Sequence, residues 1–248
     1  MERVRLIGIP GSHPVLAVQA MLDYKRIPYV RRDLPTGMQR VLLRLRGFHG
    51  RTVPVARIDG RRVEGSRAIT RALDELQPEP PLFPSDPAAR ARVEELERWA
   101  DEELQRTARM LAHWGVKHDH ASLRRFATPS YLPLPDWLVR ASVPVLAPAI
   151  LAGFSVDEQE TRSQLGVLPA QLDRIDAAIA GGLLGGDAPN AADFQVAASV
   201  GLLLCFDDLR PFVEPRPAGA LARRLTPDYP GRFGPVFPGE WLRPLARR

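Results

Sequence analysis

The residues with the clearest chemical potential form a short loop near the N-terminus, Ile9-Pro10-Gly11-Ser12-His13-Pro14. It follows a strand-like segment and precedes a helical pattern. The unpaired N–H groups and the dipole of a helix start favour an anion. A hydroxyl there can also donate to a thiolate, and lowering a thiol pKa from about 8.5 to about 6.5 takes roughly 2.7 kcal/mol. Ser12 could therefore activate a thiol, or it could merely cap the helix; His13 is expected on the surface.

Two later loops offer further binding groups. Thr52-Val53-Pro54-Val55 starts a strand, and a cis bond before Pro54 would turn the backbone groups of Val53 outward, toward a peptide-like ligand. Gly65-Ser66-Arg67-Ala68-Ile69 opens a helix whose first amides, with the Ser66 hydroxyl, suit a carboxylate. The alternative is that Ser66 simply caps this helix.

Hydrophobic periodicity and turn residues predict the elements that position these loops. Strands are expected over residues 3–9, 29–34, 53–58 and 61–64, and helices over residues 13–26, 37–46 and 66–76. Asp59-Gly60 marks the hairpin between the last two strands. The order of elements is βαβ, a helix, and a ββα unit.

The segment 77–87 holds five prolines in eleven residues and is the predicted domain boundary. Asp86 and Pro87 start a helix that is expected to reach about Leu111, and everything after it is expected to be helix and loop. We thus expect a domain over 1–77, a linker over 78–87 and a helical domain over 88–248. The tail from residue 228 is expected to wrap the surface without regular structure.

Composition excludes several classes of protein. The 34 Lys and Arg residues against 29 Asp and Glu give a formal charge of +5, but no basic stripe with interleaved aromatics points to nucleic acid. The lone cysteine, Cys205, excludes an internal disulfide and is expected to be buried and inert. The histidines lack metal-ligand spacing, so no metal is expected.

The N-terminus lacks a secretion signal, which favours the cytoplasm, and no membrane partner is expected. The apolar stretch 137–154 is interpreted as buried or pocket-lining, with a membrane-surface element as the alternative.

The three loops together resemble those of the cytosolic glutathione S-transferases, which join a thioredoxin-like α/β domain to an all-α domain. Ile-Pro-Gly-Ser-His-Pro is similar to the Pro-Gly-Ser-Ser-Pro segment of the insect delta and epsilon classes, so the resemblance implies that Ser12 activates glutathione. It also implies a thiol-binding site made of six further residues: Arg51, Val53, Pro54, Gly65, Ser66 and Arg67. The segment from Gly185 to Phe194, with Asn190 and Asp193 as a capping-box variant, resembles the family's buried helix start.

The resemblance implies a homodimeric detoxification enzyme that uses glutathione, or a related thiol, to attack a small hydrophobic electrophile. Isomerisation or dehalogenation through a thiol adduct would need the same groups. Candidates for lining the electrophile pocket are aromatic: Trp114, Tyr131, Trp137, Phe154 and Trp241. Gly65 replaces the family's Glu or Gln, with Glu64 one place early, and Arg51 stands where His is common. A non-catalytic binding or interaction protein on the same fold is therefore the alternative, whereas the absence of a cysteine in the first loop argues against a glutaredoxin.

Overall fold

The computed structural model describes residues 3–126, 135, 137–138, 141 and 156–246. The first third of the chain contains seven elements, in this order: β1 (Val4–Gly8), α1 (His13–Tyr24), β2 (Tyr29–Asp33), α2 (Gln39–Leu45), β3 (Val55–Ile58), β4 (Arg61–Glu64) and α3 (Ser66–Leu76). Each of them falls within a segment for which the sequence predicts that type of element.

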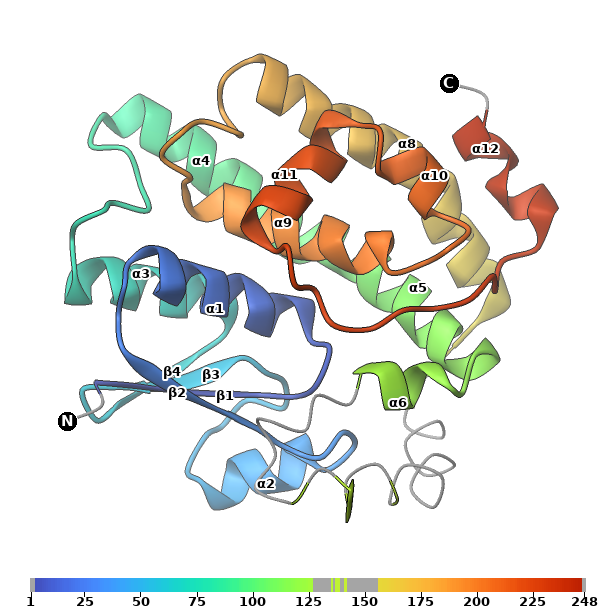
Figure 1. The fold of residues 1–248 in the computed structure, drawn as a ribbon. Coiled ribbons are helices and arrows are strands. Elements are labelled where there is room, and N and C mark those ends of the chain that lie inside the picture. Colours follow the sequence, from blue (N-terminus) through green and yellow to red (C-terminus); the bar gives the residue numbers. More distant parts are fainter. Residues whose placement is uncertain (1–2, 127–134, 136, 139–140, 142–155, 247–248) are drawn as a thin grey trace.

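The four strands form one mixed sheet in the order β2-β1-β3-β4, in which β1 pairs parallel with β2 and antiparallel with β3. Helices α1 and α3 cover one face of the sheet and α2 covers the other (Figure 1). A small core cluster beneath α2 contains Ile7, Leu43, Phe48 and Val55. This is the predicted thioredoxin-like unit, in which the loops after β1, before β3 and after β4 carry the candidate residues.

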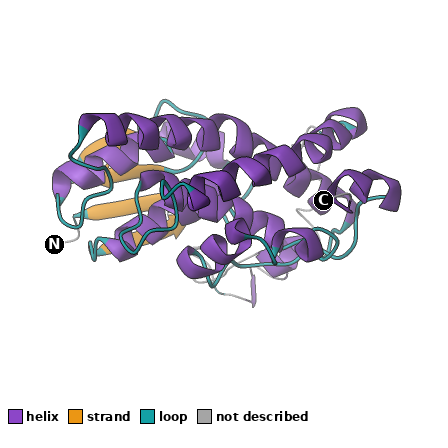
Figure 2. Ribbon diagram, turned by 90° about the horizontal axis from the view of Figure 1, so that it is seen from above, coloured by secondary structure: helices purple, strands orange, loops and turns teal. Residues whose placement is uncertain are grey.

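The rest of the described chain is helical. It contains these elements: α4 (Pro87–Trp99), η1 (Ala100–Leu104), α5 (Gln105–His118), α6 (Ser122–Phe126), α8 (Glu158–Ala180), α9 (Ala191–Leu204), α10 (Arg210–Val213), α11 (Pro217–Leu225), η3 (Gly239–Leu242) and α12 (Arg243–Ala246). Seen from above, the sheet occupies the end of the molecule near the N-terminus, and helices fill the remainder (Figure 2). The all-α expectation for this half is confirmed.

Local signals explain where several of these helices start. The Asp86 side chain accepts a hydrogen bond from the Ala89 N–H at 2.8 Å, with Pro87 as the first helical residue. Asn190 and Asp193 form the predicted capping box at the start of α9. Helix α9 is buried along almost its whole length and packs against α1, so one hydrophobic core joins the sheet unit to the helices.

Two expectations for the second half need correction. The helix that begins at Pro87 continues past Leu111 to His118 through the π-helical turn η1, because Gly115 packs closely against aromatic rings and does not end the helix. The tail is also more regular than expected, since it ends in η3 and α12. None of the described helices is long and apolar enough to cross a membrane.

Candidate functional site

Ser12 occupies the N-cap position of α1. Its backbone is extended, with φ of −71° and ψ of 110°, and its side chain makes no capping hydrogen bond. Pro14 in the first turn has no N–H to offer, while the amides of Val15 and Leu16 both turn back to the Ser12 carbonyl. Ser12 is half-buried and stands at the cap position, but the helix does not use its hydroxyl, which differs from a side-chain cap.

His13, the next residue, is only 5% exposed, so the expectation of a surface histidine is wrong. The ring is packed beneath α5, where it hydrogen-bonds the backbone of Gln105, and its Nε2 has no hydrogen-bond partner among the described residues. Burial, together with the charge of Arg109, lowers the pKa of His13 to about 3. Because the His13 imidazole is neutral, the positive potential at this helix start comes from the backbone N–H groups and from Arg109.

The loop before β3 contains a cis Val53–Pro54 bond. The Pro54 carbonyl accepts from the Gly65 N–H at 2.9 Å, which ties this loop to the start of α3. Within the described residues, no backbone hydrogen bond engages the N–H or the carbonyl of Val53. Arg51 lies exposed just before Val53.

Gly65 is the N-cap residue of α3, with a φ of 87° that favours glycine. Ser66 is therefore the first helical residue and not the cap. Glu64 is committed elsewhere, since its carboxylate accepts from the backbone N–H groups of His49 at 2.8 Å and Gly50 at 2.5 Å. The side chain of neither residue 64 nor residue 65 can serve a ligand's amine.

An acidic residue that the sequence interpretation missed stands beside Ser66. The Ser66 hydroxyl donates to Asp101 Oδ1 at 3.1 Å, and Gln105 Nε2 donates to the same oxygen at 3.0 Å. Asp101 belongs to the π-helical turn η1 and is half-buried. The start of α3 thus has amides and a hydroxyl next to a carboxylate, an arrangement that suits a zwitterionic amino-acid group.

Arg67 points into an ion-pair cluster between α3 and α4. Its Nε lies 3.6 Å from the carboxylate of Glu97, which is fully buried and also pairs with Arg71 at 2.9 Å. Burial raises the pKa of Glu97, and Arg71 and Arg67 oppose that shift. Arg67 therefore contacts the helical half of the molecule, and the predicted ligand contact through its side chain has no support in this geometry.

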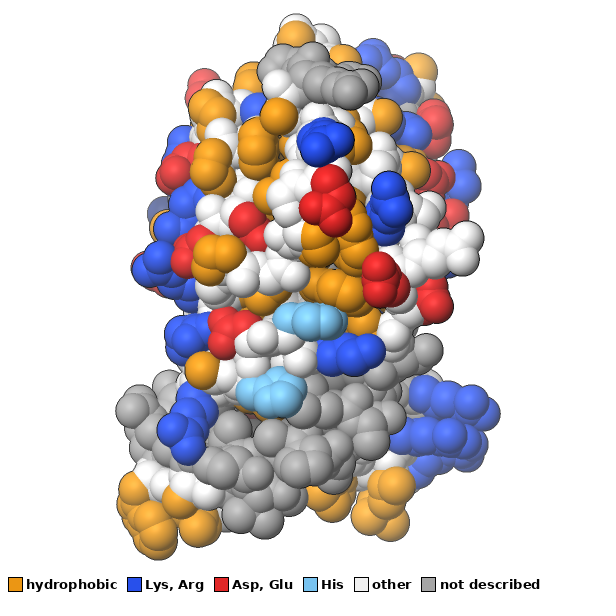
Figure 3. Space-filling view, turned by 90° about the vertical axis from the view of Figure 1, so that its right-hand side faces the viewer, with side chains coloured by type: hydrophobic (Ala, Val, Ile, Leu, Met, Phe, Trp, Pro, Cys, Tyr) orange, Lys and Arg blue, Asp and Glu red, His pale blue; other side chains and the backbone are white. Residues whose placement is uncertain are grey.

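Four polar residues line one face of the η1–α5 helix at intervals of four: Asp101, Gln105, Arg109 and His113. Burial and Arg109 lower the pKa of His113 to about 4, and burial lowers the pKa of Arg109. Because His13 interacts with Arg109 and His113, this face of the helix borders the Ser12 loop, and it is polar and cationic there. Figure 3, which views the molecule from the right-hand side of Figure 1, shows histidine, charged and hydrophobic side chains interspersed on that flank.

The aromatic candidates fall in different places. Trp114 and Trp241 are buried and pack against each other, with ring centroids 5.1 Å apart, so they fill the core. Trp137 is 70% exposed, while Tyr131 and Phe154 lie outside the described residues. Cys205 is buried, as predicted, and burial raises its pKa to about 12, which makes it unreactive.

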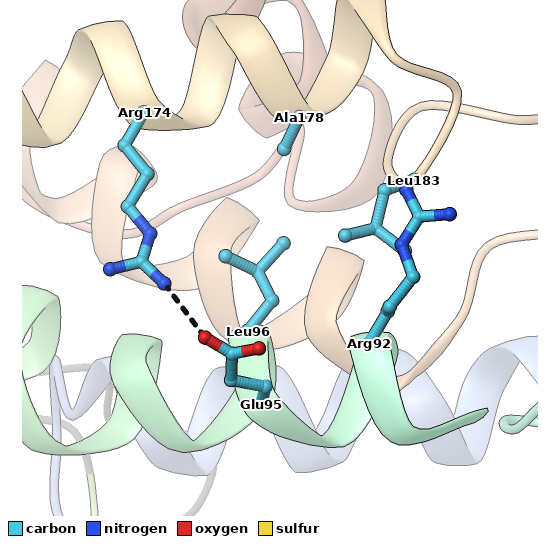
Figure 4. A pocket seen from close by; sticks show the side chains of 6 residues that line it. All are labelled: Arg92, Glu95, Leu96, Arg174, Ala178 and Leu183. Carbon is cyan, nitrogen blue, oxygen red and sulfur yellow. Dashed lines mark ion pairs between the residues drawn. The ribbon is translucent and has the colours of Figure 1, made fainter. Parts of the chain in front are cut away.

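A separate hollow lies between α4 and α8, away from the Ser12 loop (Figure 4). Its lining residues are Arg92, Glu95, Leu96, Arg174, Ala178 and Leu183. Arg174 pairs with Glu95 across the opening at 3.7 Å and also lies over the Trp99 ring. In the part of the chain that the structure describes, no group of three or more His, Cys, Asp or Glu residues gathers as a metal would require.

Comparisons with known proteins agree with this architecture. Residues 6–81 match the family model "Glutathione S-transferase, N-terminal domain". No curated protein sequence matches the chain. Among solved structures, a glutathione S-transferase from Rhodospirillum rubrum F11 is 20% identical with a TM-score of 0.60, covering 97% of this chain and 99% of that one.

Two further structures are similar over most of their length. A glutathione S-transferase from Sinorhizobium meliloti 1021 is 19% identical with a TM-score of 0.62, over 99% of this chain and 93% of that one. Maleylacetoacetate isomerase from Anaeromyxobacter dehalogenans 2CP-1, with glutathione bound in its active site, is 21% identical with a TM-score of 0.53, over 90% and 89%. The resemblance to the glutathione S-transferases is thereby confirmed: residues 6–81 form the family's N-terminal domain, and the chain as a whole has the family's two-part fold.

Proposed function

We propose that the chain binds glutathione, or a related low-molecular-weight thiol, and stabilises its thiolate for attack on an electrophile. The observation that carries this proposal is the Ser12 hydroxyl, which lies at a helix start and makes no capping bond. A thiolate placed there receives a hydrogen bond from Ser12 and lies in the positive potential of α1. The thiol proton leaves to solvent, and the sulfur forms a bond to the electrophilic carbon as the leaving group departs with its electron pair.

The remaining loops would hold the rest of the thiol compound. The peptide groups of Val53, which make no backbone hydrogen bond among the described residues, match the backbone of a cysteinyl residue. The amides at the start of α3 suit the γ-glutamyl carboxylate, while the buried Ser66 hydroxyl, already bonded to Asp101, holds that side chain in place. Asp101, beside Ser66, would accept the γ-glutamyl ammonium group and so supply the charge that Gly65 lacks.

The face of α5 beside the Ser12 loop suggests what the electrophile looks like. Arg109 is exposed on this face and makes no ion pair among the described residues, so its guanidinium is accessible to a ligand. An electrophile with a carboxylate or another anionic group near its reactive carbon would pair with this guanidinium. We therefore propose an electrophile that carries an anionic group, in place of the purely hydrophobic one that the sequence suggests. The cytoplasmic homodimer that the family resemblance implies is part of the same proposal.

The test is Ser12→Ala, with the exposed α8 serine in Ser163→Ala as the matched control. The hydroxyl's hydrogen bond to an anion is worth about 1.5–3 kcal/mol, so the pKa of the bound thiol should rise by about one to two units. Turnover should fall about 10- to 100-fold. The melting temperature should stay near that of the wild type, because Ser12 makes no capping bond to lose. Equal thiol pKa values in Ser12→Ala and the wild type would refute the role of Ser12.

A non-catalytic binding or interaction protein is the second candidate, and two departures favour it. Gly65 offers no side chain to a ligand, and Arg67 is engaged by Glu97. Calorimetric titration of the purified chain with glutathione and other small thiols separates the two functions. No detectable binding of any thiol at millimolar concentration would favour the binding protein, and binding followed by turnover would favour the enzyme.

A further inference from the structure

The C-terminal tail reaches back to the loop that carries Ser12. The Tyr229 hydroxyl donates a hydrogen bond to the Gly11 carbonyl at 3.0 Å, joining residues 218 positions apart in the chain. Gly11 directly precedes Ser12 and has a φ of 70°. Nothing in the family resemblance concerns this part of the tail, so the contact is a feature of the chain's own structure.

The contact acts on the peptide group that leads into Ser12. The Gly11 carbonyl and the Ser12 N–H belong to one planar unit, so fixing the direction of the carbonyl also fixes the direction of that N–H and the position of the Ser12 Cα. The Ser12 N–H itself makes only a long hydrogen bond, 3.3 Å to the Ile9 carbonyl. Among the described residues, Tyr229 makes the one hydrogen bond to the Gly11 carbonyl.

Packing holds the phenol in place. A Cβ on Gly201 of α9 would lie 2.8 Å from the Tyr229 ring, so the ring fits only because residue 201 is glycine. On the other side of the loop, the Phe126 ring lies 2.8 Å from where a Gly11 Cβ would be. The tail is anchored just beyond the tyrosine, where the Phe233 N–H donates to the Cys205 carbonyl at 2.8 Å. Burial raises the pKa of Tyr229 well above its usual value, which keeps the hydroxyl protonated as a donor.

We propose that Tyr229 is a positioning residue for the Ser12 site: its ring packs against Gly201, and its hydroxyl orients the Gly11–Ser12 peptide so that the Ser12 hydroxyl meets the thiol sulfur. The inference rests on the proposed function, because it concerns how well the thiolate is stabilised. Tyr229 itself touches neither the thiol nor the electrophile in this account. The tail therefore affects the proposed active site indirectly, because it fixes the backbone of the loop that carries Ser12.

The experiment compares the wild type with Tyr229→Phe, which keeps the ring and removes the hydrogen bond. The matched control is Arg232→Ala, which breaks the Arg232–Asp207 pair that anchors the tail at 2.7 Å and leaves the loop contact intact. Thiolate absorbance against pH gives the pKa of bound glutathione, and steady-state kinetics separate kcat from KM. Tyr229→Phe should raise the bound thiol pKa by about half a unit or more and lower kcat about fivefold, the size of one hydrogen bond, with KM for glutathione nearly unchanged. Arg232→Ala should match the wild type in all three.

A second variant approaches the same contact from the other side. Gly201→Ala keeps the tyrosine hydroxyl but places a Cβ 2.8 Å from the Tyr229 ring and 2.9 Å from Thr226 Oγ1, so the ring must shift and the thiol pKa should change in the same direction. Wild-type values of thiol pKa and kcat in Tyr229→Phe, or the same changes in Arg232→Ala, would overturn the inference and leave the proposed function standing. A wild type that binds no thiol would overturn both, and titration of the wild type alone reveals that case.

Discussion

Acid should destabilise this protein through His13, by an amount that follows from its burial. Burial and Arg109 lower the pKa of His13 to about 3, and the unfolded chain restores it to about 6.5. Because the folded pKa is the lower one, the unfolded state binds more protons between these two values. Stability is therefore complete above about pH 6.5 and is lost as the pH falls toward 3. His113, lowered to about 4, adds a loss of the same sign.

At pH 5 the size of the loss is insensitive to the folded values, since both lie below 5. At that pH the unfolded imidazole is 1.5 pH units below its pKa, so protonation stabilises the unfolded state by about 2 kcal/mol for each histidine. Replacement with a neutral amide, His13→Asn, keeps a donor for the Gln105 backbone and removes one of the two contributions. The free energy of unfolding of the wild type should drop about 2 kcal/mol more than that of His13→Asn between pH 8 and pH 5.

Urea unfolding at the two pH values measures this double difference, in which carboxylates common to both proteins cancel. His120→Asn, a change at an exposed histidine, is the control and should behave like the wild type. An equal drop in the wild type and in His13→Asn would refute the reasoning, because it would mean that the folded protein accommodates a proton on His13 at no cost.

Three further predictions concern charges that sequence patterns do not reveal. Asp101→Asn should weaken glutathione binding about tenfold in calorimetry and leave cysteinylglycine, which lacks the γ-glutamyl group, unaffected; equal losses for both thiols would contradict the ammonium contact. Arg109→Ala should lower kcat/KM for an electrophilic nitrobenzoate about tenfold relative to its methyl ester, and an unchanged ratio would exclude a role in recognising anions. Asp74→Ala should cost about 3–5 kcal/mol in urea unfolding, because it removes the counter-charge at 2.9 Å from the fully buried Lys25 ammonium and leaves it the neutral Pro80 carbonyl at 2.6 Å. Lys25→Met should cost clearly less, and a larger loss in Lys25→Met would count against that explanation.

The fold could be predicted well because its local signals agree with one another. Hydrophobic periodicity located the elements of the sheet unit, and short-range capping at Asp86 and Asn190 located the starts of two helices. These signals act within one turn of helix or one hairpin. The end of the long helix was misplaced, since Gly115 and the residues around it are held helical by aromatic rings from distant parts of the chain.

The sequence could predict only those features of the candidate site that depend on residues close together in the chain. Positions before helices and a strand single out Ser12, Val53 and Ser66 in the sequence, and their roles stay predictions. The burial of His13 is set by α5, and the contact of Asp101 with Ser66 spans 35 residues. No spacing rule connects such positions, because their proximity depends on how α4 and α5 cross the start of α3.

Both chemically important helix starts of the sheet unit are completed by side chains or backbone from the helical half. The peptide before Ser12 receives the Tyr229 hydrogen bond, and Ser66 donates to Asp101. Both neighbours contact residues at the helix starts, within the one turn over which the helix dipole favours an anion. In the proposed function, the thiol affinity and the thiolate pKa are therefore properties of the contact between the two halves of the chain. The proposal then predicts that changes in the helical half can separate binding from catalysis while the loops of the thioredoxin-like domain stay the same.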